Sequence, residues 1–144
     1  MFRHFMVLLI CLSPVLGFAQ TFPQRASNDI NDLANVLNDD DRAEVREMLR
    51  GLKSDTGIEM TVLTIENQAP YAPNQTLEGF ATALFNNWEI GDASRNDGIL
   101  VLVLPGDRAM RIELGSGYDK SWDDVAGRVI DRSFLPSFRS DKYS

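Results

Sequence analysis

Carboxylate and amide side chains gather at both ends of one largely apolar stretch of this sequence. Asn96 and Asp97 stand just before a run of apolar residues, while Asp119, Asp123 and Asp124 follow the alternating segment that comes next. Carboxylate and amide oxygens are the ligands that Ca²⁺ and Mg²⁺ prefer, and carboxylates held close together repel one another without a cation. If the two ends lie side by side, they predict a divalent-cation site.

The segment between these ends predicts a β-hairpin that brings them together. Residues 99–104 are six consecutive apolar residues, which is typical of a central strand buried on both faces. Residues 109–114 alternate between apolar and polar side chains, and Pro105-Gly106-Asp107-Arg108 is a turn. Antiparallel pairing across this turn places Asp97 opposite Ser116, so both polar ends meet at one edge of the sheet.

Turn and capping roles also account for these residues one by one. Asn96-Asp97-Gly98 has the composition of a turn, and Ser121-x-x-Asp124 matches a capping box at the start of a helix. Gly115 and Gly117 supply backbone freedom whether or not a site is present. The residues alone leave both readings open, a shared cation or separate structural roles.

The mature protein lacks side chains that many catalytic and metal sites need. Residues 1–19 have a basic start, an apolar run and small residues at Gly17 and Ala19, and they predict a secretory signal peptide cleaved after Ala19. Cleavage removes His4 and Cys11, which are the only histidine and the only cysteine of the sequence. Their loss excludes a Ser-His-Asp or Cys-His nucleophile, a disulfide framework and a conventional zinc site.

Length and charge limit the class of protein further. We expect residues 20–27 to form an N-terminal arm and residues 28–144 to form one domain, exported to the periplasm or secreted. No membrane span is expected in the mature chain. The formal charge of −7 becomes −8 when Arg3 leaves with the signal peptide. This balance argues against nucleic acid as a partner and is compatible with divalent cations.

Periodic apolar residues predict the elements that position the hairpin. Residues 58–65 are rich in β-branched side chains and predict a strand, while residues 28–37 predict irregular structure or one short helix. A helical crossover makes the strands at 58–65 and 99–104 parallel. The fold class is therefore α/β, with a small mixed β-sheet sandwiched between helices. The expected helices span residues 39–54, begin after a cap at Thr76, and run from Ser121 to a stop at Pro136.

Longer blocks of the sequence resemble one known family. The blocks cover Asn31 to the end of the chain and read NDLANVLNDDDRAEVREMLRGLKSDTGIEMTVLTI, LFNNWEIGDASRNDGILVLVLPGDRAMRIELGSGYD and LPSFRSDKY. The family's order is kept by four short motifs, Trp88-Glu89-Ile90-Gly91, Asn96-Asp97-Gly98, Arg111-Ile112-Glu113 and Gly115-Ser116-Gly117. On these motifs the sequence is similar to the TPM-domain family, which includes the thylakoid-lumen acid phosphatases and many bacterial secreted or membrane-tethered proteins.

The resemblance implies an α-β-α sandwich that lies outside the cytoplasm. It also implies that some members bind a divalent cation, with Ca²⁺ as the leading candidate. It also implies phosphatase activity in the lumenal members, which are associated with the repair of membrane-protein complexes. Matched position by position, the family's polar motif residues are Asp32, Asn96, Asp97, Glu113 and Asp124. The hairpin geometry brings Asp97 and Asp124 together, but it does not place Asp32 beside them.

The sequence departs from the family pattern in this same region. Ser116 stands where the family often has an aromatic residue, and Asp119 stands where it usually has glutamate. Lys120 replaces a frequent glycine, and Asp123 occupies a position where a small or hydroxyl residue is common. The chain stops at Ser144, where the family continues with a glycine and a further helix, so we expect a truncated C-terminal part.

Three functional hypotheses follow. In the first, the chain binds Ca²⁺ or Mg²⁺ at the carboxylate edge and assists the maintenance of envelope or membrane-protein complexes. In the second, it is a metal-dependent acid phosphatase that acts on phosphomonoesters, with Asp97, Asp119 and Arg111 as catalytic candidates. Arg111 is equally a candidate for a surface salt bridge. The third is a purely structural interaction domain. The predicted cation ligands are Asp97, Asp124, Asp119, Asp123, Asn96, Glu113 and Asp32.

Overall fold

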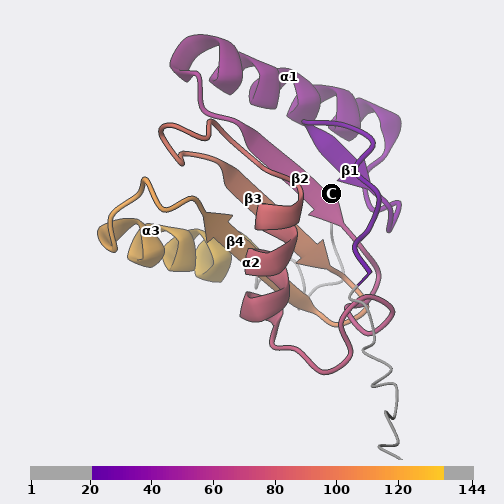
Figure 1. The fold of residues 1–144 in the computed structure, drawn as a ribbon. Coiled ribbons are helices and arrows are strands. Elements are labelled where there is room, and N and C mark those ends of the chain that lie inside the picture. Colours follow the sequence, from indigo (N-terminus) through magenta and orange to yellow (C-terminus); the bar gives the residue numbers. More distant parts are fainter. Residues whose placement is uncertain (1–20, 135–144) are drawn as a thin grey trace, which may run out of the picture.

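A four-stranded sheet with helices on both faces forms the protein (Figure 1). The computed structural model describes residues 21–134. The predicted signal peptide and Pro136 lie outside the described residues. The elements in chain order are β1 (Ile30–Asp32), α1 (Asp39–Thr56), β2 (Met60–Thr64), α2 (Leu77–Asn87), β3 (Ile99–Leu104), β4 (Ala109–Leu114), α3 (Ser121–Val129) and a π-helical turn, η1 (Ile130–Phe134).

The sheet has the strand order β1-β2-β3-β4, with three parallel strands and one antiparallel edge strand. The α2 crossover between β2 and β3 makes these strands parallel, as the sequence predicts. In the hairpin, Leu104 pairs with Ala109 and Ile99 pairs with Leu114. The predicted mixed sheet and the hairpin register are therefore confirmed.

The main hydrophobic core lies between the sheet and α2. Leu100 and Leu102 of β3 are completely buried against Phe80 and Leu84 of α2, with Leu63 of β2 beside them. The β3 side chains on the other face of the sheet are only partly buried. The expectation that β3 is buried on both faces is therefore wrong for this second face. The cause is that α1 covers the β1 and β2 side of that second face (Figure 1).

The ends of α1 follow from local chemistry. The Asn38 side chain accepts a hydrogen bond from the amide of Asp41 at 2.9 Å, and three aspartates occupy the positive first turn. Gly57 ends the helix in the left-handed conformation, with φ 76°, and its amide donates to the Lys53 carbonyl. The helix thus runs two residues beyond the predicted end at Ser54.

The first strand was not expected from the sequence. Residues 28–37 contain β1, which pairs in parallel with β2 through Ile30 and Val62. Three residues, of which Asn31 and Asp32 are polar, carry no strand periodicity. The strand exists because β2 offers it hydrogen bonds, including one from the Val62 amide to the Asp29 carbonyl at 2.8 Å.

The predicted N-terminal arm packs onto the domain from Thr21 onward. Phe22 stacks on Phe80 with ring centroids 6.4 Å apart, and the Trp88 indole donates to the Pro23 carbonyl at 3.1 Å. Arg25 donates to the Trp88 carbonyl and to the Glu59 carboxylate, both at 2.6 Å, and lies over the Trp88 ring. These residues extend the core on its α2 side through the Phe22 ring, and the Arg25 contacts join the arm to Trp88 and Glu59.

The last helix is less covered than its apolar stripe suggests. The α-helix ends at Val129, and none of its side chains is fully buried. Trp122 and Val129 are 47% and 41% exposed, although Trp122 still makes an edge contact with Tyr118 at 5.7 Å between centroids. In the stretch that the structure covers, no helix has both the length and the apolar character that crossing a membrane requires.

Candidate functional site

The predicted site lies where β3 begins and β4 ends, and three backbone segments meet there. We call this the glycine junction, comprising residues 90–91, 96–98 and 115–117. The Gly115 amide donates to the Gly98 carbonyl at 2.9 Å. A Cβ at Gly115 would lie 2.1 Å from the Asn96 carbonyl oxygen, and one at Gly98 would lie 2.2 Å from the Ile90 oxygen. Both positions therefore require glycine.

Asp97 is held inside this junction by its neighbours. Its carboxylate accepts hydrogen bonds from the Arg95 guanidinium at 2.6 Å and from the Asp92 amide at 3.3 Å, and the side chain is 16% exposed. The Arg95 guanidinium holds the pKa of Asp97 below its ordinary value. Burial and the Asp97 charge raise the pKa of Tyr118, whose hydroxyl donates to the Asp97 carbonyl at 2.8 Å. Asp97 thus holds the junction together.

Asp119 shapes the entry to α3. One oxygen of its carboxylate accepts hydrogen bonds from the amide of Ser121, at 2.8 Å, and from the hydroxyl of the same residue. These bonds lower the pKa of Asp119. The helix cap is Lys120, which makes no side-chain capping bond, so Ser121 does not form the considered capping box with Asp124. Asp119 instead takes the local role of an Asx turn.

Asp123 and Asp124 lie on the first turn of α3, and their carboxylates have no partner within residues 21–134. Both side chains are exposed, and within residues 21–134 neither makes a hydrogen bond or an ion pair. The amides at a helix N-terminus stabilise such carboxylates without consuming all their oxygens. Both carboxylates therefore keep their oxygens available, whereas Asp119 keeps only the oxygen that Ser121 does not use.

Asn96, Arg111 and Glu113 make contacts within the sheet and with α2. Asn96 adopts φ 50°, and its carbonyl accepts the Gly117 amide at 2.8 Å. Arg111 and Glu113 lie on the α2 side of β4, where the guanidinium donates to the Glu113 carboxylate at 3.1 Å. Thr82 of α2 donates to the same carboxylate at 2.8 Å. The salt-bridge reading of Arg111 is confirmed.

Asp32 lies in β1, at the opposite edge of the sheet from Asp97 and Asp124. Its side chain, 2% exposed, accepts hydrogen bonds from Thr64 at 2.5 Å and from Arg42 at 2.9 Å. The amides of Val36 and Leu37 also donate to it at 3.1 Å. Burial raises the pKa of Asp32, but these hydrogen bonds outweigh it and leave the pKa lowered. Asp32 anchors the loop that joins β1 to α1.

The carboxylates at the two edges do not converge on one point. Among residues 21–134, no group of three or more Asp, Glu, His or Cys side chains is arranged to hold a metal ion. The cation site predicted from the sequence therefore stays a prediction, and its available oxygens are those of α3.

The family assignment rests on a match that spans this whole region. The family model of the TPM domain matches residues 30–144. This chain belongs to the TPM-domain family. The N-terminal domain of a P. gingivalis protein is similar in structure, with a TM-score of 0.68 and 27% identity over 79% of this chain and 71% of that chain.

A second solved TPM-like fold supports the architecture alone. The N-terminal domain of the cg2496 protein from Corynebacterium glutamicum has a TM-score of 0.62 and 12% identity, covering 87% of this chain and 80% of that chain. No curated protein matches the chain. The comparisons therefore establish the TPM family and its mixed α/β fold.

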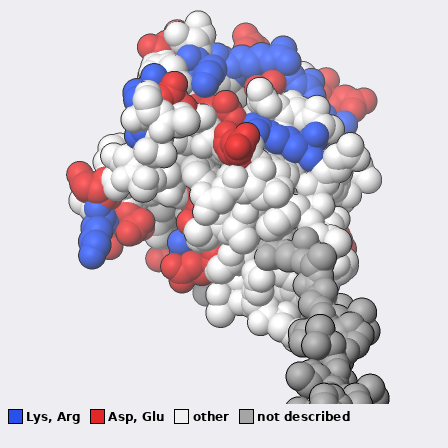
Figure 2. Space-filling view, in the orientation of Figure 1, with Lys and Arg blue, Asp and Glu red and all other residues white. Residues whose placement is uncertain are grey.

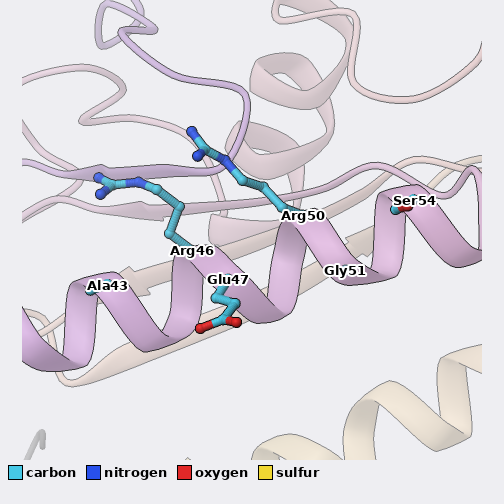
Figure 3. A pocket seen from close by; sticks show the side chains of 6 residues that line it. All are labelled: Ala43, Arg46, Glu47, Arg50, Gly51 and Ser54. Carbon is cyan, nitrogen blue, oxygen red and sulfur yellow. The ribbon is translucent and has the colours of Figure 1, made fainter.

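The surface formed by residues 21–134 of this TPM domain includes a hollow on α1 and another beside the glycine junction. One, of about 470 Å³, lies along α1, where Figure 3 shows Arg46 and Arg50 pointing to one side of the helix and Glu47 to the other. Figure 2 shows basic side chains gathered over this helix, at the top of the view. The other, of about 400 Å³, adjoins the glycine junction and is lined by Phe85, Asn86, Glu89, Ile90, Gly91, Ala93 and Asn96.

Sequence reasoning missed two features of this region. The partner of Asp97 is Arg95, only two residues away, and the alternation of charges in Arg95-Asn96-Asp97 could have suggested it. The hollow beside the junction is lined in part by Glu89, which adopts φ 50° after the end of α2. The sequence signal was a glutamate at the position where helices usually place glycine.

Proposed function

We propose that this chain is an exported TPM domain that binds Ca²⁺ at the start of α3 and assists the maintenance of envelope or membrane-protein complexes. The observation that carries the proposal is the pair of exposed aspartates, Asp123 and Asp124, with no described partner. Asp119 adds the carboxylate oxygen that Ser121 does not use. Hard cations take several such oxygens together with water.

The remaining predicted ligands take a supporting place in this proposal. Asp97 is neutralised by Arg95, and a cation would have to displace that guanidinium at 2.6 Å. Glu113 is engaged by Arg111 and Thr82, while Asp32 is enclosed at the other edge. We therefore expect Ca²⁺ to contact the α3 carboxylates and to leave the glycine junction intact.

A binding role has more support than the phosphatase alternative. The phosphatase hypothesis needs Arg111 to reach a phosphoryl oxygen beside the metal. Arg111 instead pairs with Glu113 of its own strand at 3.1 Å and with Glu78 of α2 at 3.7 Å. Export is supported by the leader-like residues 1–19, and the envelope role by the resemblance to lumenal and bacterial TPM proteins.

Titration of the metal-free mature chain with Ca²⁺ tests the site. We expect heat by calorimetry and amide NMR shifts confined to residues 119–124. Replacement of both Asp123 and Asp124 by asparagine should abolish the response. Asp39 and Asp40 occupy the equivalent first turn of α1, so their double asparagine variant is a matched control that should bind normally. A flat titration, or equal loss in the control, would refute the proposal.

Phosphate release from p-nitrophenyl phosphate separates the two functions. We expect no release above background with Ca²⁺ or Mg²⁺. Metal-stimulated release that disappears in Asp97→Asn would instead support the phosphatase hypothesis. Release that survives this substitution would indicate contamination or a different site.

A further inference from the structure

The 400 Å³ hollow beside the glycine junction has an unusual set of polar groups at its rim. It lies between the C-terminal end of α2 and the turn that leads into β3, with the Phe85 and Ile90 side chains among its walls. Asn86, Glu89 and Asn96 contribute polar side chains, which make no hydrogen bond or ion pair with residues 21–134. A concave site with an apolar wall and a few convergent polar groups is typical of ligand binding.

Two physical effects act against a glutamate at position 89. Its φ of 50° lies in the left-handed region, where a side chain is strained and glycine or asparagine is the usual choice. It also follows the C-terminal end of α2, where the helix dipole favours cations and disfavours a carboxylate. A bound positive charge would offset the second effect.

Two basic residues near this hollow, Arg25 and Arg95, are engaged elsewhere. Arg25 lies at the end of α2, but it donates to the Trp88 carbonyl and pairs with Glu59. Arg95 pairs with Asp97 at 2.6 Å. Within residues 21–134, neither guanidinium nor any other side chain forms an ion pair with Glu89. The negative potential at this rim therefore remains available to a ligand.

We propose that this hollow binds the ammonium or guanidinium side chain of a partner polypeptide. Glu89 supplies the counter-charge, the amide oxygens of Asn86 and Asn96 accept hydrogen bonds, and the Phe85 ring lies against the alkyl stem or the cation. A single carboxylate suits a monovalent organic cation better than Ca²⁺, which requires several oxygen ligands. The formal net charge, −7 for the full sequence and −8 without Arg3, further steers basic partners toward the protein.

Small probes test the proposal on the whole mature chain. Nα-acetyl-lysine methylamide and Nα-acetyl-arginine methylamide should shift the amide signals of residues 86–96 by NMR. The norleucine analogue, which has the same stem without charge, should not. Glu89→Gln should weaken the apparent affinity roughly fivefold, the size expected of one partly exposed ion pair. Glu44→Gln removes an exposed carboxylate from α1 and should leave affinity unchanged.

The outcomes separate this site from the proposed calcium site. Probe shifts at residues 86–96 together with Ca²⁺ shifts at residues 119–124 would support two independent sites. Absence of probe shifts, or equal shifts with norleucine, would overturn the cation pocket whatever the calcium result. If Ca²⁺ shifted residues 86–96 and displaced the lysine probe, the pocket would be a metal site and the proposal would be wrong.

Discussion

Replacing Glu89 by glycine should make the TPM domain more stable. The residue holds φ 50° directly after α2, so its Cβ meets the backbone strain that glycine avoids. Glu89 also follows the C-terminal end of α2, where the helix dipole disfavours a carboxylate. Both effects act in the folded state, and Glu89→Gly removes both at once.

The two effects can be given rough sizes. A left-handed conformation costs an L-residue about 1 kcal/mol relative to glycine. An exposed carboxylate at a helix C-terminus costs roughly 0.3 kcal/mol more. We therefore expect Glu89→Gly to raise the free energy of unfolding by about 1 kcal/mol. Glu89→Gln relieves only the charge and should raise it by roughly 0.3 kcal/mol.

Urea unfolding followed by circular dichroism measures these differences. The same substitution at Glu44, inside α1, should have the opposite sign and lower the free energy of unfolding by about 1 kcal/mol. If Glu89→Gly is neutral or destabilising while the Glu44 variant behaves as expected, the strain argument is wrong. A stabilised Glu89→Gly variant that also loses the lysine probe would show that position 89 is maintained at the expense of stability.

Three further changes probe the junction and the opposite edge. Gly115→Ala should lower the free energy of unfolding by at least about 2 kcal/mol, because the added Cβ would lie 2.1 Å from a backbone oxygen. Gly51→Ala, in an open position of α1, should raise it by about 0.5 kcal/mol in the same urea assay. Arg95→Gln should destabilise the protein at pH 7. Because the pKa of folded Asp97 lies below the ordinary 3.8, this deficit should shrink as pH falls below that value and the carboxylate protonates; a deficit independent of pH would argue against the ion pair. Asp32→Asn should cost about 2 kcal/mol in thermal or urea unfolding, since it weakens a buried set of four hydrogen bonds, and a loss near zero would contradict that accounting.

Much of the fold could be predicted because several helices and strands have a clear apolar pattern within their own residues. The six apolar residues of β3 and the alternation of β4 determined the hairpin, and the turn between them set its register. Apolar periodicity and capping side chains located α1 and α2 to within a few residues. These elements agree with the structure because pattern, propensity and turn chemistry favour the same answer.

Other features could not be predicted because they depend on distant partners. β1 forms only because β2 offers hydrogen bonds, and its own three residues have no strand pattern. The availability of Asp97 depends on the direction of the Arg95 side chain, which composition does not reveal. The exposure of Trp122 likewise depends on how much of α3 is covered by the rest of the domain. The helical spacing of apolar residues does not predict that coverage.

The sequence by itself determined that acidic and amide residues meet at one end of a hairpin, because antiparallel pairing makes the start of β3 and the end of β4 neighbours. Tertiary structure decided which of those residues retain free oxygens. Arg95 engages Asp97 and Ser121 engages one oxygen of Asp119, whereas the side chains of Asp123 and Asp124 have no partner within residues 21–134. The reason is that a side chain's hydrogen-bond partners depend on its position and direction in three dimensions. Residue type and spacing along the sequence do not specify that geometry.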